Sequence, residues 1–499
     1  VNLYIDKTMK VRYFALALWA SLLLVSSCGD KKEVEVLIPV SEKALEDTSS
    51  IFYADFASYP QERGRLPIGV FDSGTGGLTV QEKLLTLDEF DNITGKPSPD
   101  GVPDFAGENF IYLADDANMP YGDYDAAGKS DYLRELVVKD ALFLLGDSYY
   151  NLAVDDQPYG VKEQVKILVI ACNTATAYGL ADIEKLLERS RTGVKVIGVI
   201  NAGVRATLTG LDKTQNYAIG VMATPGTISS GAYERTIRQM AAEQGFEGAI
   251  TVVNQPALGF ANAVDGVEDY VKPGVVLPRE EYRGPVLGKG DGDINPSIMD
   301  RYDFDFSKGG IVYSKMDGEY SRVQINSADN YARFHLVSLV EKHRKSGSKT
   351  PLTHIILGCT HYPYHLEVLE ETVEFLRNYK KDGVYIYRNV IAADFKFIDP
   401  AQYTAMECYT LLRESGELAY RVEKGALYPY ISIPAYGLPV ENVDKNGDLT
   451  YDFKYGREVG TEDVTTKVVP FSSRYIDQST IDRMARLVPE SYEMFKERL

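Results

Sequence analysis

Positive charge is scarce in this chain: 53 Lys and Arg stand against 72 Asp and Glu, which leaves a formal net charge of -19 over 499 residues. An acidic surface repels phosphate backbones and anionic lipid headgroups, which argues against nucleic acid or an anionic membrane surface as the main partner. The same field does nothing to attract an anionic substrate. The remaining composition, 44% apolar and 25% charged, is that of a globular chain long enough for two domains with substantial cores.

Complete nucleotide and metal motifs are missing as well. The glycine-rich run 74–77 is not followed by the Lys-Ser/Thr pair of a phosphate loop and does not have dinucleotide-binding spacing. The aspartate-rich segments 291–295 and 444–448 begin like calcium loops but lack Gly at the sixth position and Glu at the twelfth, so we interpret them as solvated turns. Histidines near Cys359 could suggest zinc, yet one of them lies in a predicted strand. We therefore expect no metal.

Long apolar runs are confined to the N-terminus. Residues 14–25 are apolar, basic residues precede them, and small residues lead from them to Cys28. A membrane-spanning helix needs about 20 apolar residues, so this run is short for a span. The pattern resembles a bacterial lipoprotein signal. We expect translation to start at Met9, cleavage before Cys28, a lipid anchor on Cys28, and a location outside the cytoplasm on a bacterial membrane.

Beyond the predicted signal at 1–27, a polar stretch at 28–65 is predicted to be a tether, and apolar strands then alternate with amphipathic helices. Strands are predicted at 66–71, 110–114, 165–171, 194–199, 217–222, 249–253 and 354–357, and helices at 76–87 and 181–187. This alternation predicts an α/β fold with parallel sheets. We expect two parallel-sheet α/β domains that face each other across a central crevice.

The expected domain boundaries follow from this order of elements. The first domain is expected to comprise residues 66–199 and 366–499, including a C-terminal extension. The second is expected at 200–365, with an insertion at about 266–330. The insertion and the extension suggest extra surface or a lid over the crevice.

The chain has only 4 cysteines, and two of them sit in matching settings. Cys172 follows an apolar strand and precedes Asn173 and Thr174, and Cys359 follows another strand and precedes Thr360. Ligands gather at the carboxyl ends of strands in parallel sheets. Two thiols placed there can act on one carbon from opposite sides, which suggests removal and return of a proton, the chemistry of a racemase. Cys408 has no such motif and is interpreted as structural.

Five short motifs occur in order along the chain, at residues 68–80, 120–122, 171–175, 226–228 and 357–363. Together they resemble the motif series of glutamate racemases, in the aspartate/glutamate racemase superfamily. The resemblance covers roughly 66–265 and 350–415. It implies interconversion of L- and D-glutamate without a cofactor, in which one cysteine as thiolate removes the α-proton and the other as thiol delivers a proton to the opposite face.

The resemblance also implies a role for individual residues. Cys172 is expected to act on the D-enantiomer and Cys359 on the L-enantiomer, with Asp72 and His361 assisting proton transfer beside them. Family members carry a glutamate in the second domain near the position of Ala263, and here Asp265 stands two residues further on. The substrate amino acid is expected to be held by Ser73, Tyr121, Gly122, Asn173, Thr174, Thr227 and Thr360. Backbone N–H groups at helix starts suit its carboxylates.

Two other functions stay open at this stage. The chain could be an extracytoplasmic lipoprotein that binds an acidic amino acid without turnover, or an aspartate racemase with the same chemistry. Exchange of the α-proton in deuterated water separates the first from a racemase. A homodimer also stays open as the assembly.

Overall fold

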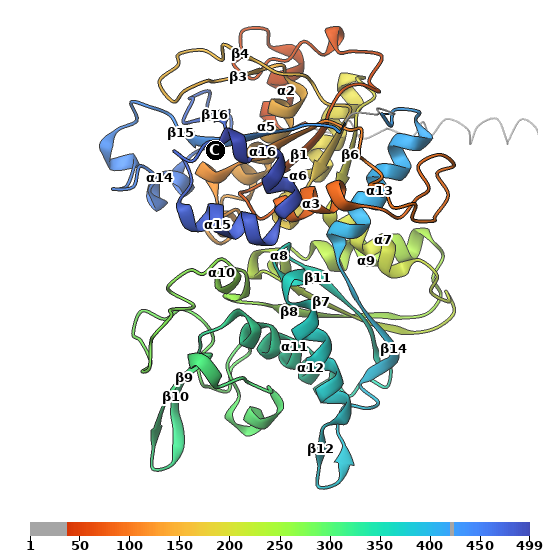
Figure 1. Cartoon of the computed structure of the whole chain (residues 1–499), viewed down its shortest axis with the longest axis vertical. Coiled ribbons are helices and arrows are strands. Elements are labelled where there is room, and N and C mark those ends of the chain that lie inside the picture. The colour runs from red at the N-terminus through yellow and green to blue at the C-terminus, as the bar shows by residue number, and fades with distance from the viewer. Residues whose placement is uncertain (1–36, 420–423) are drawn as a thin grey trace, which may run out of the picture. The chain divides into compact units, whose positions relative to one another are not determined.

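Near-continuous apolar runs form the strands of a first sheet in the computed structural model, which describes residues 37–419 and 424–499 (Figure 1). Its order is β16-β15-β2-β1-β5-β6. The strands are β1 (Ile68–Asp72), β2 (Phe110–Ala114), β5 (Ile167–Ile170), β6 (Lys195–Gly198), β15 (Leu427–Pro434) and β16 (Thr466–Pro470). Only the β15–β16 pair is antiparallel. Strands β1, β2 and β5 are buried at every position, as expected for a parallel sheet with both faces covered.

A second parallel sheet has the order β14-β11-β7-β8. Its strands are β7 (Tyr217–Ala223), β8 (Ile250–Pro256), β11 (Leu352–Gly358) and β14 (Ile391–Ile398). All of its pairs are parallel. The predicted fold class, α/β with two parallel sheets, is confirmed.

We call the part built around the sheet β16-β15-β2-β1-β5-β6 the first half of the molecule, and the part built around β14-β11-β7-β8 the second half. The second half extends further than the predicted boundary at residue 365. Helix α12 (Leu366–Asn378) buries Leu369 and Val373 in the second core, and β14 pairs with β11. The chain returns to the first core only with α13 (Pro400–Glu414), which buries Ala405 there. The boundary was misplaced because β14 has an exposed, partly charged centre and lacks the apolar run of the other parallel strands.

Helices and short hairpins complete the described chain (Figure 1). The larger helices are α3 (Leu78–Thr86), α5 (Ser130–Leu145), α6 (Asn173–Ser190), α7 (Val199–Leu208), α9 (Ala232–Glu243), α11 (Ala328–Lys345), α15 (Gln478–Leu487) and α16 (Pro489–Phe495). The shorter ones are α4 (Gly122–Ala126), α8 (Pro225–Ser229), α10 (Phe260–Val264) and α14 (Tyr451–Gly456). The hairpins are β3 (Ser148–Tyr149) with β4 (Gly160–Val161), β9 (Ile311–Met316) with β10 (Glu319–Ile325), and β12 (Lys380–Lys381) with β13 (Val384–Tyr385).

The predicted tether at 28–65 is wrong for its second part. Residues 39–499 form one unit, in which helix α2 (Pro39–Glu46) buries Val40 and Ala44, one helical turn apart. Further along, the phenol of Tyr59 donates a hydrogen bond of 2.6 Å to the carbonyl of Val165. The predicted lipoprotein signal and Cys28 lie outside the described residues. Within 37–419 and 424–499, no helix combines the length and hydropathy of a membrane span.

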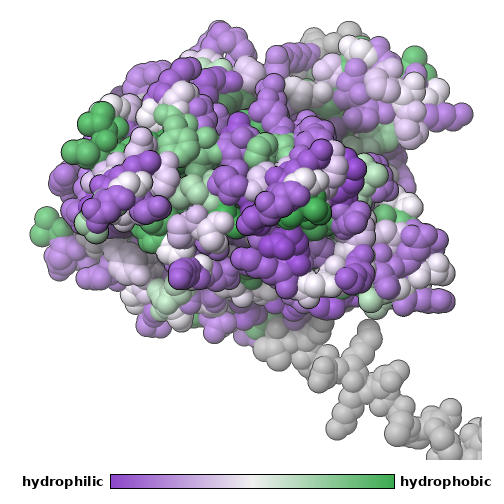
Figure 2. Space-filling model, turned by 90° about the horizontal axis from the view of Figure 1, so that it is seen from below, coloured by the Kyte–Doolittle hydropathy of each residue, from purple (hydrophilic) through white to green (hydrophobic). Residues whose placement is uncertain are grey.

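One face of the molecule shows how polar and apolar residues are distributed on the surface (Figure 2). The face shown in Figure 2 is mainly hydrophilic, and hydrophobic residues appear on it as small separate patches. Scattered apolar side chains of this kind are normal on soluble surfaces.

Candidate active site

The loop after β1 brings Asp72 and Ser73 to Cys172. Cys172 is the N-cap of α6, where its Sγ accepts a hydrogen bond of 3.4 Å from the N–H of Ala175 and lies 3.7 Å from the Oγ of Ser73. The Asp72 carboxylate accepts a hydrogen bond of 2.8 Å from the N–H of Gly77. Glycine is required there, because a Cβ on Gly77 would lie 2.4 Å from the Cβ of Asp72. Cys172 and Asp72 are 7% and 6% exposed.

The surroundings of Cys172 favour a neutral thiol. Burial, reinforced by the charge of Asp72, raises the pKa of Cys172. Burial also raises the pKa of Asp72, against the opposing hydrogen bonds from Gly77 and Cys172. A neutral thiol is suited to donate a proton, and a carboxyl group with a raised pKa beside it is suited to exchange that proton.

Cys359 has the opposite electrostatic setting. Its Sγ lies 3.5 Å from the Nδ1 of His361, and the Nε2 of His361 lies 3.1 Å from the Oδ1 of Asp265. Burial alone would lower the pKa of His361, but Asp265 and Cys359 outweigh it and hold that pKa well above the usual value. A protonated imidazole next to sulfur stabilises the thiolate. Cys359 is 7% exposed, like Cys172, and both are free cysteines.

Asp265 is kept ionised by two cationic neighbours. Burial raises the pKa of its carboxyl, but His361 and Arg483 together hold that pKa below the usual value. The Nε of Arg483 lies 3.4 Å from the Oδ1 of Asp265. Asp265 thus stands next to His361, although the glutamate expected from the resemblance is absent at Ala263.

The residues that follow Cys172 contact side chains of the second half of the molecule. The phenol of Tyr233 donates a hydrogen bond of 2.7 Å to the Oδ1 of Asn173. The hydroxyl oxygens of Thr174 and Thr227 lie 3.5 Å apart. Asn173 and Thr174 begin helix α6 directly after Cys172, so the expected binding residues of the first half face the second half.

Two glycines allow close approach at the same junction. A Cβ on Gly76, in the loop that carries Asp72, would lie 2.8 Å from the Cε1 of His361 and 3.3 Å from the Oγ1 of Thr360. A Cβ on Gly226 would lie 2.9 Å from the Cα of Gly122. Backbone from one half therefore lies against the motif residues of the other.

The side chain of Tyr121 supports the loop that contains Gly122. Its phenol hydrogen-bonds to Asp115 and, at 2.7 Å, to Asp140. Full hydrogen bonds from one phenol to both oxygens require a second proton, carried by one of the two carboxyl groups. Burial and the charge of Asp115 raise the pKa of Asp140 well above its usual value, which favours the protonated form of Asp140 in this pair.

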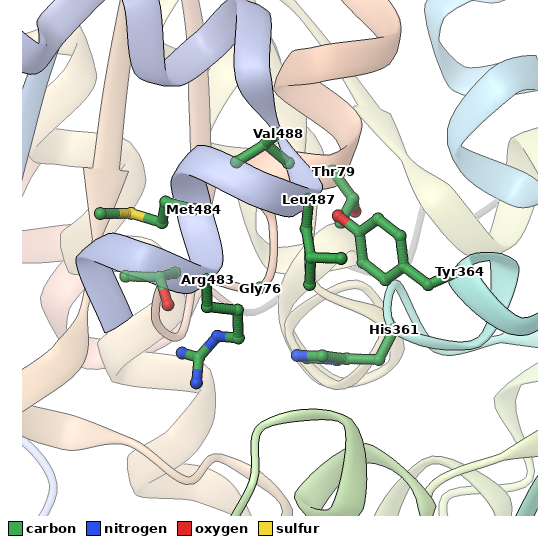
Figure 3. Close-up of a pocket in the computed structure, with 9 residues that line it drawn as sticks. Gly76, Thr79, His361, Tyr364, Arg483, Met484, Leu487 and Val488 are labelled. Carbon is green, nitrogen blue, oxygen red and sulfur yellow. The ribbon is translucent and has the colours of Figure 1, made fainter. Parts of the chain in front are cut away.

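A small, partly open pocket adjoins His361. It is lined by Thr75, Gly76, Thr79, His361, Tyr364, Arg483, Met484, Leu487 and Val488. Figure 3 shows Arg483 and His361 extending into the same region from different elements, with the His361 ring directed toward the side from which Arg483 comes. Arg483 was missed by sequence reasoning, since α15 lies beyond the motif series and carries no motif of its own. Tyr233 was missed because it lies between two of the motifs and belongs to neither.

The remaining residues considered in the sequence lie elsewhere. His354 contacts the hydroxyl of Thr353 at 3.1 Å, and His365 contacts a carboxylate oxygen of Asp329 at 2.8 Å. Cys408 is buried in the first core. Within the part of the chain that the structure describes, no group of three or more acidic, His or Cys side chains is arranged to hold a metal ion.

Comparison with curated proteins finds distant homology to glutamate racemases. No family model matches the chain. The glutamate racemase of Syntrophus aciditrophicus is 31% identical over 223 residues, which are 45% of this chain and 63% of the relative. Those of Oceanobacillus iheyensis and Corynebacterium diphtheriae are 35% and 37% identical over 35% and 34% of this chain. The chain spans 47% and 46% of these two relatives, about half of their length.

Solved structures of glutamate racemases are also similar. One from Bacillus anthracis covers 74% of this chain and 89% of its own at 22% identity, with a TM-score of 0.41. One from Francisella tularensis, solved with D-glutamate, covers 80% of this chain and 99% of its own at 20% identity, with a TM-score of 0.37. Scores this low carry no argument, so the fold rests on the sheet topology described above.

Proposed function

We propose that this protein is an amino-acid racemase that interconverts L- and D-glutamate, with Cys172 and Cys359 as the two bases and no cofactor. The observation that carries this proposal is the contrast between two buried thiols. Cys172 has a raised pKa beside a carboxyl group, whereas Cys359 stands 3.5 Å from a histidine whose pKa is held high. A two-base racemase needs one protonated and one ionised thiol at the same time.

The proposed reaction from L-glutamate begins at Cys359. Its thiolate takes the α-proton, the Cα–H bond breaks, and the electron pair is delocalised into the α-carboxylate. Cys172 then delivers its S–H proton to the opposite face, which forms the D-enantiomer and leaves a thiolate. His361 and Asp72 exchange protons with solvent and restore the starting states. In the reaction from D- to L-glutamate, Cys172 as thiolate removes the α-proton and Cys359 as thiol delivers one.

Substrate binding is proposed to rest on the polar groups gathered at the junction. The Tyr233 hydrogen bond occupies the Oδ1 of Asn173 and so directs the amide NH₂ of Asn173 toward a carboxylate. The start of α6 offers backbone N–H groups and a favourable dipole for the same charge. Ser73, Thr174, Thr227 and Thr360 supply further hydroxyl groups.

Racemisation and α-proton exchange test the proposal. The purified protein in deuterated water is given L- or D-glutamate, and deuterium incorporation is followed by NMR while optical rotation reports racemisation. Cys172→Ala and Cys359→Ala should each lower racemisation by about 100-fold or more, the usual loss when an acid–base group is removed. Cys408→Ala, which removes a buried cysteine of the first core, is the matched control. Full turnover in either active-site variant would exclude the two-base mechanism.

The same measurement separates the alternatives. Saturable glutamate binding by calorimetry without deuterium incorporation would identify a binding protein. Faster exchange with aspartate than with glutamate would identify an aspartate racemase.

We also propose, from the residue pattern before Cys28, that the mature protein is lipid-anchored outside the cytoplasm. Fractionation of cells that express the full chain tests this, because Cys28→Ala should move the protein out of the membrane fraction. Retention of the variant in the membrane would contradict the anchor.

A further inference from the structure

The C-terminal helices α15 and α16 are anchored on the first half. Met484 and Val488 are buried in the first core. Glu82 on α3 accepts hydrogen bonds of 2.9 and 2.8 Å from the backbone N–H groups of Glu490 and Ser491, and one of 2.7 Å from the Ser491 hydroxyl. This pair of helices is therefore fixed to the half that carries Cys172.

From that base, Arg483 reaches across to the second half. Its Nη1 donates a hydrogen bond of 3.1 Å to the carbonyl of Asp265, and its Nε lies 3.4 Å from the Asp265 carboxylate. Asp265 caps α10, whose Phe260 stacks on Tyr362 with ring centroids 4.3 Å apart. The Arg483 side chain is 19% exposed, so this ion pair is shielded from most solvent.

We infer that Arg483 is a positioning residue for the Cys359 half of the proposed active site: it holds Asp265 against His361, and so sets the environment of the Cys359 thiol. The inference rests on the proposed racemase function. It assigns a role in that reaction to the C-terminal extension, which lies outside the motif series.

Several charged or titratable groups lie near the contacts that link Arg483 through Asp265 and His361 to Cys359. They are Asp72 at the end of β1, Cys359 after β11, Tyr362 and Tyr364 in the turn that follows, Asp265 after α10, and Arg483 on α15. Arg483 is the permanent positive charge among them. Its removal disfavours the ionised form of Asp265, so the acid side of the pH dependence of the Cys359 reaction should move upward.

Deuterium exchange in variants that keep only one of the two cysteines isolates the Cys359 reaction. In a Cys172→Ala background, deuterium enters L-glutamate through Cys359 alone, and in a Cys359→Ala background it enters D-glutamate through Cys172 alone. Adding Arg483→Gln should slow the first exchange about tenfold near neutral pH and move its pH profile upward by about one unit. The second exchange should stay within about twofold, because the ion pair of Arg483 is with Asp265, which contacts the histidine beside Cys359.

Two further variants distinguish positioning from general structure. Arg483→Lys keeps the charge and should restore most of the pH profile. Arg486→Gln removes an exposed charge from the same helix and should change neither exchange. Equal slowing of both exchanges, an unmoved pH profile, or no rescue by lysine would overturn the inference. Absence of α-proton exchange in the protein that keeps both cysteines would instead overturn the proposed function.

Discussion

At the scale of single residues, the glycine-rich loop after β1 donates backbone hydrogen bonds to a carboxylate of the protein itself and not to a phosphate. Its amide groups point at Asp72, with the Gly77 N–H at 2.8 Å. The sequence predicted the cluster of Asp72 and Ser73 at a strand end, because the motif is local. It could not predict the contact between Asp265 and Arg483, which lie 218 positions apart in the chain and have no shared pattern.

Replacement of Gly77 should disable the site without unfolding the protein. The Cβ of Gly77→Ala would lie 2.4 Å from the Cβ of Asp72 and 2.9 Å from that of Ala171, so the Asp72 carboxylate must move. We expect a loss of exchange of about 100-fold or more and a decrease in the free energy of unfolding of about 1–3 kcal/mol. NMR exchange and urea denaturation measure the two effects.

Gly456→Ala is the control for that prediction. A Cβ at this position meets no atom within 4 Å, so exchange and stability should both stay unchanged. Normal exchange in Gly77→Ala would show that the position of Asp72 is not critical.

At the scale of elements, the parallel strands were predictable and the additions were not. Strands such as β1 and β5 are short apolar runs buried throughout, which is a strong local signal. By contrast, β16 is an edge strand with only one buried position, and its place beside β15 is decided by tertiary pairing. Helix α2 was not predicted because its buried residues cover only one helical turn, which is too short a pattern to recognise in the sequence.

Helix α2 should contribute to stability if it is part of the folded unit. Val40 is fully buried, so Val40→Ala should lower the free energy of unfolding by about 2 kcal/mol, from lost burial and the cavity left behind. Glu42→Ala, on the exposed side of the same helix, should change it by less than about 0.5 kcal/mol. Urea denaturation compares the two. Equal stability of both variants and the parent would indicate a loose tether after all.

At the scale of the whole molecule, the excess of negative charge brings carboxylates from distant segments together around Asp116. Asp116 follows β2 directly after Asp115, and the C-terminal extension adds Asp448 and Asp477 nearby. Burial first, and these carboxylates next, raise the pKa of Asp116 to about 6, although Lys454 opposes them. The charge of this carboxylate cluster therefore changes close to neutral pH.

The raised pKa of Asp116 predicts a pH-dependent stability. The folded state binds this proton more tightly than the unfolded chain, whose Asp has a pKa of 3.8, so the contribution is complete below 3.8 and is lost as the pH rises through about 6. Asp116→Asn should flatten the stability profile between these values. Carbon NMR of the carboxyl group and urea denaturation at several pH values measure this. A titration midpoint near 4 would contradict it.

The pairing of β15 with β2 has a consequence for how the protein is made. Strand β2 lies between β1 and β15, and β15 is translated only after the entire second half. Until then, one edge of β2 has no partner on a growing chain, and an open edge is a template for pairing with other chains. Synthesis that stops before β15 would therefore leave an aggregation-prone product, so the last part of the chain protects the first.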